Sequence, residues 1–288
     1  MRHWREQRRA LILAPVSAFL RAQERKPNMF GNAEAYERFM GRWSRLVSPL
    51  LVDFANLPDR GRVLDVGSGT GSLAIAIAER KPNVRVLGID PSKEYVAYAA
   101  SKNPFADRAS FEVGDAQKLS HPDASFDAAV SLLVFNFIPD PKKALSEVRR
   151  VTKPGGTISA AVWDYSAGMR MLRIFWDAAV AIDPAAEKRD EKHMPLCRSG
   201  ELSRLWKDGG LQGVHEQSLD IKTEFPSFID YWESFLLGQG PAGAYATSLD
   251  RAKQQALRGE VKRRLALSAE DRPFTLPARV WAVRGTAP

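Results

Sequence analysis

The residues of this chain best suited to chemistry lie in segment 63–71, VLDVGSGTG, where an apolar run and Asp65 precede three glycines at alternate positions. The pattern predicts a strand that enters a tight loop, and a helical stretch, 72–79, follows at once. A second apolar run, 84–89, ends in Asp90, nineteen residues beyond the last glycine. A glycine loop at the start of a helix, with an acid closing the next strand, is typical of a nucleoside-binding site.

The spacing of the loop indicates which nucleoside it binds. A dinucleotide loop has the pattern Gly-x-Gly-x-x-Gly and places a pyrophosphate at the helix N-terminus. Here the pattern is Gly-x-Gly-x-Gly, and Asp65 lies two residues before the first glycine. A carboxylate at that place would repel a pyrophosphate, but it suits a ligand with an ammonium group. S-adenosylmethionine (SAM) has an ammonium group, a sulfonium cation and no phosphate, so charge favours SAM over NAD.

Two acids beyond the loop extend the pattern. Asp90 closes the second predicted strand, where its two oxygens could accept hydrogen bonds from both ribose hydroxyls. Asp115, in the run Gly114-Asp115-Ala116, closes the third and could accept one from the adenine amino group. Each acid also has a structural explanation, because Asp65 could cap the following helix and the other two could be turn residues.

The predicted elements alternate along the chain in a way that would bring these acids together. The predicted strands are 62–66, 84–89, 110–113, 126–133, 157–162, 214–221 and 275–284. The predicted helices are 33–54, 72–80, 93–101, 142–151, 166–182 and 199–207. Apolar strands separated by helices imply an α/β fold, with a parallel sheet covered on both faces. Ligands bind such sheets beyond the carboxyl ends of the strands, where the strand order reverses.

A helical insertion, 222–272, lies between the last two predicted strands. An insertion of this size, where a hairpin loop would suffice, predicts a lid or substrate wall. Near its start, Phe228, Tyr231 and Trp232 have the spacing i, i+3, i+4. That spacing fits a pocket lining for an apolar or aromatic acceptor, and it fits core packing equally well.

The basic N-terminal segment 1–30 stands apart from these elements. It holds seven Arg and Lys against two Glu, which leaves only +3 of the net charge of +8 for the rest of the chain. Its basic start and apolar continuation mimic a signal peptide, but we interpret it as a flexible tail or a start-site artefact. The expected organisation is then a single domain at 31–288, with a helical cover at 31–60, a cofactor-binding core at 61–165 and the lid insertion.

Composition limits the classes of function. The 288 residues are 44% hydrophobic and 26% charged, which is ordinary for a globular protein. The nearly balanced charge of the main body does not indicate nucleic-acid binding, and no run of about eighteen apolar residues predicts a membrane span. Cys197 is the single cysteine, which excludes a cysteine-cluster metal site and suits a reducing compartment such as the cytoplasm. We expect a small-molecule ligand, no metal, and a monomer or homodimer.

The chain resembles the class I SAM-dependent methyltransferases, closest to the branch with quinone-biosynthesis and related small-molecule enzymes. The resemblance rests on segments 63–71, 88–91, 114–119, 125–137 with 140–141, and 153–156. It implies a Rossmann-like, seven-stranded sheet in which only the last strand is antiparallel. The glycine loop would line the methionine end of SAM, and the backbone of 131–133 would lie beneath the sulfonium. The cofactor-binding set that the resemblance implies is Asp65, Gly67, Ser68, Gly69, Gly71, Asp90, Pro91, Asp115, Ala116, Ser131 and Leu132.

The segment 36–44 precedes the first strand, where related enzymes fold a helix over the cofactor. Arg42 could pair with the methionine carboxylate, and Tyr36 or Trp43 could present an aromatic face to the sulfonium. An amphipathic helix packed on the sheet explains the segment equally well.

Three residues are candidates for catalysis. Asn136, just past the fourth strand, could donate a hydrogen bond to an acceptor oxygen. Asp164, at the end of the fifth strand, could act as a base or orient the acceptor. His193 is the best placed of the four histidines for a general base. Each of the three also fits a plain structural role.

The sequence thus predicts a SAM-dependent methyltransferase that transfers a methyl group to a small organic acceptor by in-line displacement. A non-catalytic SAM-binding or scaffold protein remains an alternative. A nicotinamide-dependent oxidoreductase is disfavoured by the loop spacing and by Asp65. Among quinone, phenol, sterol-like, carboxylic-acid and amine acceptors the sequence does not choose.

Overall fold

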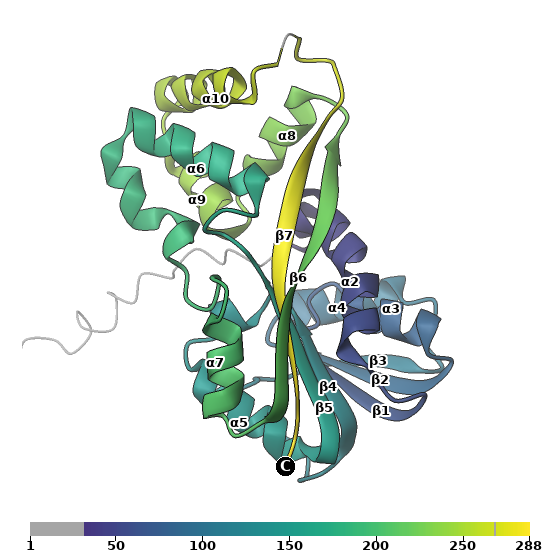
Figure 1. Cartoon of the computed structure of the whole chain (residues 1–288). Helices are drawn as coiled ribbons and strands as arrows, with labels where there is room; N and C mark the ends of the chain where they lie inside the picture. The colour runs from purple at the N-terminus through teal and green to yellow at the C-terminus, as the bar shows by residue number, and fades with distance from the viewer. Residues whose placement is uncertain (1–31, 268) are drawn as a thin grey trace, which may run out of the picture.

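The computed structural model describes residues 32–267 and 269–288, which form one mixed sheet with helices on both faces (Figure 1). The predictions made for 1–30 lie outside these residues. Within the described part of the chain, no helix is both long and apolar enough to cross a membrane.

Among these residues, seven strands pair in the order β3-β2-β1-β4-β5-β7-β6. The strands are β1 (Arg60–Val66), β2 (Asn83–Asp90), β3 (Ala109–Val113), β4 (Phe126–Leu132), β5 (Thr152–Trp163), β6 (Gln212–Phe225) and β7 (Phe274–Thr286). The pairs from β3 across to β5 are parallel, and β7 runs antiparallel to both β5 and β6. This confirms the predicted fold class, including a final strand that alone is reversed. The strand order reverses between β1 and β4.

Helices cover the sheet in two layers. They are α1 (Ala33–Tyr36), a π-helical turn (Glu37–Gly41), α2 (Arg42–Ala55), α3 (Ser72–Arg80), α4 (Lys93–Lys102), α5 (Pro141–Val151), α6 (Arg170–Ile182), α7 (Glu201–Asp208), α8 (Phe228–Phe235), α9 (Gly240–Ser248) and α10 (Arg251–Leu265). Figure 1 shows α2, α3 and α4 on one side of the sheet and α5 and α7 on the other. The remaining helices α6, α8, α9 and α10 gather around the far ends of β6 and β7.

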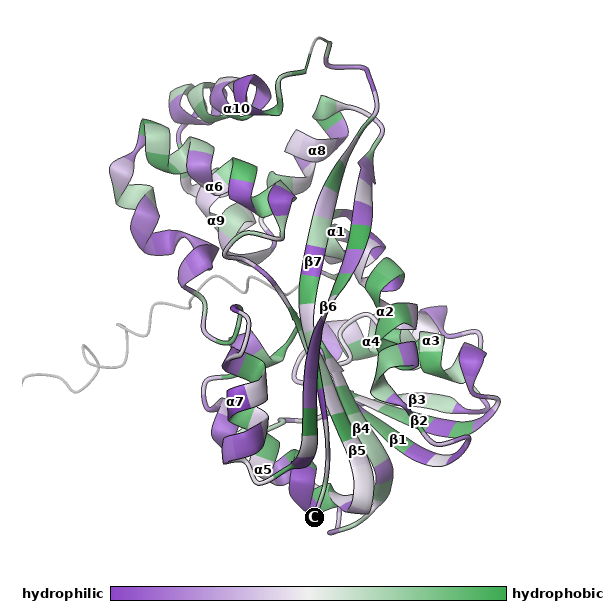
Figure 2. Ribbon diagram, in the orientation of Figure 1, coloured by the Kyte–Doolittle hydropathy of each residue, from purple (hydrophilic) through white to green (hydrophobic). Residues whose placement is uncertain are grey.

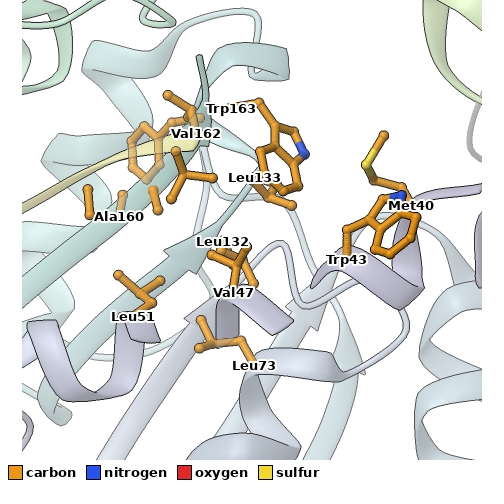
Figure 3. Packing of buried hydrophobic residues seen from close by; sticks show 14 of the residues in the cluster. Met40, Trp43, Val47, Leu51, Leu73, Leu132, Leu133, Ala160, Val162 and Trp163 are labelled. Carbon is orange, nitrogen blue, oxygen red and sulfur yellow. The ribbon is translucent and has the colours of Figure 1, made fainter. Parts of the chain in front are cut away.

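The core follows from the apolar faces of these elements. β4, in the middle of the sheet, is buried along nearly its whole length, as expected for a parallel strand covered on both faces. Hydrophobic residues follow α2 along the sheet, whereas α10 carries many hydrophilic ones (Figure 2). In Figure 3, Val47 and Leu51 of α2 lie near Leu73 and Leu132. This packing explains why Pro49 lies inside α2 without ending it, because apolar burial there compensates for one lost backbone hydrogen bond.

Several element boundaries differ from the sequence predictions. β5 begins at Thr152, five residues before its predicted start. The predicted helix 33–54 contains the π-helical turn Glu37–Gly41, and the helix expected from 166 begins only at Arg170. β6 extends four residues beyond its predicted end, so the insertion predicted at 222–272 begins within a strand. β6 and β7 form a long antiparallel ladder from Gln212 to Phe225, and this ladder carries the three helices of the insertion.

The aromatic residues of the insertion form a core of their own. Phe228, Tyr231 and Trp232 are buried, and the Tyr231 hydroxyl donates a hydrogen bond to the Met171 carbonyl over 2.7 Å. Phe235 stacks on Phe175 of α6, with ring centroids 4.3 Å apart. The spacing of Phe228, Tyr231 and Trp232 fitted either a pocket lining or core packing. In the structure these side chains are buried in the packing of α8 and do not line a substrate pocket.

We predict that Trp206→Ala lowers the free energy of unfolding by about 3–5 kcal/mol. Trp206 of α7 is fully buried, donates its indole N–H to the Ile158 carbonyl over 3.0 Å and meets Phe135 edge-to-face. Urea denaturation measures the change. The exposed Ile229 serves as control, since Ile229→Ala should change stability by no more than about 0.5 kcal/mol. A loss below about 1 kcal/mol for Trp206→Ala would contradict the packing described.

Candidate functional site

A cavity of about 860 Å³ opens at the carboxyl ends of the parallel strands. Its wall includes the glycine loop after β1 and the ends of β2, β3, β4 and β5. This is the topological switch point, where α/β sheets bind their ligands. The volume is within the usual range for small-molecule sites.

The glycine loop takes a conformation that side chains would prevent. Gly67 and Gly69 have φ angles of 72° and 53°, in the left-handed region. A Cβ on Gly67 would lie 2.5 Å from a methyl group of Val134, whereas one on Gly69 would meet no atom within 4 Å. The amides of Gly67 and Ser68 both donate to the Ile89 carbonyl over 2.8 Å, which ties the loop to the end of β2.

Asp90 is held by the loop on one side and by its own turn on the other. Its Oδ2 accepts from the Gly69 amide over 3.0 Å, and its Oδ1 accepts from the Ser92 amide over 2.8 Å. Burial raises the pKa of Asp90, and the two amides act in the opposite direction. A carboxylate has about four acceptor sites, so each oxygen retains capacity for a ribose hydroxyl. Asp90 and Pro91 both line the cavity.

Asp65 does not line the cavity but lies fully buried at the end of β1. Neither of its oxygens has a regular hydrogen-bond partner among the described residues, and the Ala74 amide approaches too loosely to make one. Burial raises the pKa of Asp65 to about 8, with a further increase from Asp90. At neutral pH this carboxyl is largely protonated, so the charge argument against a pyrophosphate is weaker than the sequence implied.

The adenine end of the predicted site lies in the cavity wall. Asp115 and Ala116 both line it, and Asp115 Oδ1 accepts from the Gln117 amide over 2.8 Å. Gln117 in turn accepts from the Asp140 amide over 3.0 Å. The contact of Asp115 with an adenine amino group stays a prediction.

The end of β4 supplies backbone and apolar surface. Leu132 lines the cavity, as does Leu133, whose φ of 64° is uncommon for a large side chain. Such strain persists where the surroundings impose it, and here the Leu133 amide donates to the Ala161 carbonyl over 2.7 Å. Ser131 is not in the cavity wall, because its hydroxyl donates to the Val66 carbonyl and joins β4 to β1.

The N-terminal helical segment covers one side of the cavity. Tyr36 lines it, with its hydroxyl 3.3 Å from the Ser44 hydroxyl and its ring 5.5 Å from that of Tyr95. Burial raises the pKa of Tyr36 to about 12. The Thr70 hydroxyl donates over 2.5 Å to Glu37, which joins the glycine loop to the π-helical turn. π-helical turns are often found at functional sites.

Arg42 and Gly71 both lie outside the cavity wall. Arg42 forms an ion pair of 2.7 Å with Asp230 of α8, and its guanidinium lies over the Trp43 ring at 4.4 Å. Neither Arg42 nor Trp43 is in the cavity wall. Gly71 is also outside the wall, where a Cβ would lie 3.0 Å from the Phe111 ring. The position of Arg42 does not support the predicted pairing with a methionine carboxylate.

None of the three predicted catalytic residues lines the cavity. Asn136 is buried beside it, and its Nδ2 has no hydrogen-bond partner among the described residues. Asp164 caps its own turn, accepting from the Ser166 hydroxyl over 2.6 Å and the Ala167 amide over 3.1 Å. His193 lies half exposed, 3.0 Å from Glu187.

Another part of the cavity wall comes from residues that the sequence analysis did not name as site residues, although Met40 lies in the segment 36–44 and Trp163 lies next to Asp164. Trp163 ends β5 and is buried, and its indole nitrogen has no partner in the described chain. In Figure 3 its ring extends from the strand end toward Met40. Tyr165, Glu191, Met40 and Gly240 also belong to this wall. Glu191 lies in the charged run 187–193, which has the composition of a solvated surface, so only the fold reveals its burial.

The residues present fit SAM as a ligand. The loop presents backbone without side chains, the buried Ser68 hydroxyl at the wall has no partner among the described residues, and Asp90 has acceptor capacity for a diol. The wall near the loop carries no cation other than Lys93 among the described residues, so nothing there is arranged to bind a pyrophosphate.

Comparison with known proteins agrees with this reading. Residues 64–160 match the methyltransferase domain family. The demethylmenaquinone methyltransferase of Renibacterium salmoninarum is 31% identical over 168 residues, which cover 58% of this chain and 67% of that protein. The chain belongs to the class I SAM-dependent methyltransferases. The family membership leaves the nicotinamide alternative without support.

Two further comparisons define the extent of the likeness. A ubiquinone/menaquinone biosynthesis C-methyltransferase of Geobacter sulfurreducens is 38% identical over 100 residues, or 33% of this chain and 39% of that protein. The match thus spans about two fifths of that relative. A putative methyltransferase of Bacillus halodurans of known structure has a TM-score of 0.56 at 19% identity, covering 84% of this chain and 98% of that one, which shows the shared fold.

We predict that Arg42→Ala lowers the free energy of unfolding by about 1–2 kcal/mol and leaves SAM affinity within about threefold. The reason is that Arg42 contacts Asp230 and Trp43 and not the cavity. Asp230→Ala is the matched variant and should act in the same direction. Calorimetric titration and urea denaturation measure the two quantities. A tenfold weaker affinity for SAM at unchanged stability would contradict this prediction and would indicate that Arg42 contributes to SAM binding.

We also predict that the ligand-free chain loses stability as pH rises from about 4 to about 8. Asp65 has a raised pKa of about 8, so its protonated form stabilises the fold at low pH, and this contribution falls as pH rises through that value. Asp65→Asn should therefore gain stability relative to wild type with rising pH, by at most about 1.4 kcal/mol per pH unit. The exposed Asp107→Asn is the control. If the free energy of unfolding depended on pH in the same way for wild type and Asp65→Asn, the raised pKa of Asp65 would be contradicted.

Proposed function

We propose that this chain is an active methyltransferase that transfers the methyl group of SAM to a small, apolar, quinone-type acceptor. The observation that carries the proposal is one cavity that has two different kinds of wall. One wall consists of the glycine loop, Asp90 and Asp115, and the other of aromatic and apolar side chains around Trp163.

The second wall supports an uncharged acceptor. Trp163, Tyr165 and Met40 offer apolar surface with few polar atoms. In the described part of the cavity wall, Lys93 at the start of α4 is the single Lys or Arg, and it follows Asp90 by three residues in the chain. A phosphate or carboxylate acceptor would lack a cationic partner there. The related proteins of Renibacterium and Geobacter are named for quinone methylation, which agrees with such an acceptor.

When bound, the cofactor supplies an electrophilic methyl carbon. The contribution of the chain is to align an acceptor atom with that carbon and to exclude water. Alignment of this kind can contribute about 7–11 kcal/mol to lowering the barrier. Leu132 and Leu133, at the end of β4, also line the cavity and would form apolar surface where the two ligands meet.

The setting of this activity is part of the proposal. Cys197 is buried and free, which fits a reducing compartment, and we place the enzyme in the cytoplasm as a monomer or homodimer. A small molecule is the substrate, since the charge of the main body does not favour nucleic acid.

Calorimetric titration of the full chain with SAM and with NAD tests the cofactor. Transfer of labelled methyl from SAM to a panel of hydroquinones, phenols, carboxylic acids and amines tests the acceptor. We expect SAM binding and transfer to hydroquinones or phenols. SAM binding without transfer to any member would favour a scaffold protein, and NAD binding alone would overturn the proposal.

We predict that Asp90→Ala weakens SAM binding by roughly 100-fold or more, because two charge-assisted hydrogen bonds of about 1.5–3 kcal/mol each are lost. The variant should also be less stable, since the Gly69 and Ser92 amides lose their acceptor. Asp59→Ala, at an exposed site paired with Lys81, is the control and should bind SAM normally. An unchanged affinity of Asp90→Ala for SAM would show that Asp90 does not bind the ribose.

A further inference from the structure

A buried carboxyl group lies in the acceptor half of the cavity, outside every sequence motif. Glu191 is 4% exposed and lines the cavity together with Trp163 and Tyr165. It belongs to a short 3₁₀ helix, Glu191–His193, in the connection between α6 and α7. Acidic residues are almost never buried without a partner or a function.

The orientation of Glu191 is fixed by its neighbours. Its Oε2 accepts a hydrogen bond from the indole N–H of Trp176 over 2.7 Å, and Trp176 is fully buried. The adjacent Asp190 accepts from both terminal nitrogens of Arg173, over 2.6 and 2.7 Å, which anchors the backbone of the turn to α6. Among the described residues the only hydrogen bond to the Glu191 carboxyl is the one to Oε2, so Oε1 is the oxygen left for a ligand.

Among the residues that the structure describes, no Lys or Arg forms an ion pair with Glu191. Arg173 on α6 is occupied by Asp190 and Asp177, and it lowers the pKa of Glu191 only as the smallest contribution. Asp190 raises that pKa. Tyr165 and Cys197, which face it from the adjoining loops, both have raised pKa values and are neutral at pH 7. Burial dominates and raises the pKa of Glu191 to about 7.

We propose that Glu191 is the proton acceptor of the reaction and that the methyl acceptor is a neutral arene with a hydroxyl group, a phenol or hydroquinone, whose proton it takes. The inference rests on the proposed function. Its position follows from the cavity, because Glu191, Tyr165 and Trp163 line the same cavity as Tyr36 and Asp90. Glu191 therefore faces the acceptor side of the same cavity whose other side is the cofactor wall.

The step balances in atoms and electrons. The hydroxyl O–H bond breaks, and its proton passes to Oε1 of Glu191. An electron pair of the resulting phenolate, on oxygen or on a ring carbon, forms the bond to the methyl carbon, while the carbon–sulfur bond breaks and its pair stays on sulfur. In methylation on carbon, Glu191 returns the first proton to the oxygen, which restores the hydroxyl, and then takes the ring proton. One proton is released in either case. General-base assistance of this kind contributes about 10²–10⁴-fold to rate.

The test compares Glu191→Gln with Glu187→Gln in the full-length chain. Gln keeps an oxygen to accept from Trp176 but cannot take a proton. Glu187 is four residues earlier, pairs with Lys192 and His193, and is outside the cavity wall, so its variant changes the same charge without touching the site. With a hydroxyarene, we expect kcat for Glu191→Gln to fall by roughly 100-fold or more, with SAM affinity within about threefold of wild type. Glu187→Gln should match wild type.

The pH profile and a second readout distinguish proton transfer from a structural role. The wild-type rate should rise with pH through about 7 and Glu191→Gln should lose this limb. In the ligand-free protein, the indole N–H signal of Trp176 in nuclear magnetic resonance, assigned with Trp176→Phe, should shift with a midpoint near pH 7. That shift should be absent in Glu191→Gln.

Several results would overturn the inference. A Glu191→Gln enzyme with wild-type kcat and pH profile, or a Trp176 signal that does not titrate, would remove Glu191 as proton acceptor while leaving methyl transfer in place. Transfer to amines but not to hydroxyarenes would overturn the acceptor class. A wild-type chain that does not bind SAM would instead overturn the proposed function, and the inference would fall with it.

Discussion

The attachment of the glycine loop to the end of β2 is the constraint on which the rest of the site depends. Two loop amides share the Ile89 carbonyl, and a third, that of Gly69, bonds to the Asp90 carboxylate. These contacts hold bare backbone at the rim of the sheet, where a ligand can approach it closely. They require left-handed backbone at Gly67 and Gly69, which only glycine adopts at little cost. Asp90 thus organises the loop before it contacts any ligand.

Burial of acidic groups is the second theme of the site. Asp65, Asp90 and Glu191 are all removed from water near the cavity, and burial raises the pKa of each. Such groups destabilise the ligand-free fold at alkaline pH, and a protein tolerates that cost where the group serves a ligand. Their local supports differ. Asp90 has two backbone amides, Glu191 has one indole N–H, and Asp65 has no regular partner among the described residues.

The wall around Trp163, where we place the acceptor, is formed by other elements than the glycine loop, Asp90 and Asp115 of the cofactor wall. It comes from the end of β5, from the turn at Glu191 and from the first turn of α9 at Gly240. The long β6–β7 ladder carries α8, α9 and α10 past the edge of the sheet, where they pack with α6 (Figure 1). Their aromatic residues pack against one another instead of facing the ligand. Of the insertion, Gly240 and Pro241 line the cavity, and the packed aromatic residues support the wall from outside.

The sequence by itself determined the sheet, the glycine loop and the acids at the strand ends. These features depend on local patterns: apolar runs, glycine spacing and residues adjacent to a strand, so they can be read from neighbouring positions. Only the tertiary structure decided what Arg42, His193 and Glu191 do, because each depends on partners far away in the chain. Arg42 meets Asp230 of α8, and His193 turns to Glu187 at the surface. Glu191, in a run that has the composition of solvated surface, is buried against Trp176 because α6 folds over it. Burial, which sets the proton affinity of a carboxyl group, is a property of the folded molecule and has no signature in the spacing of residues.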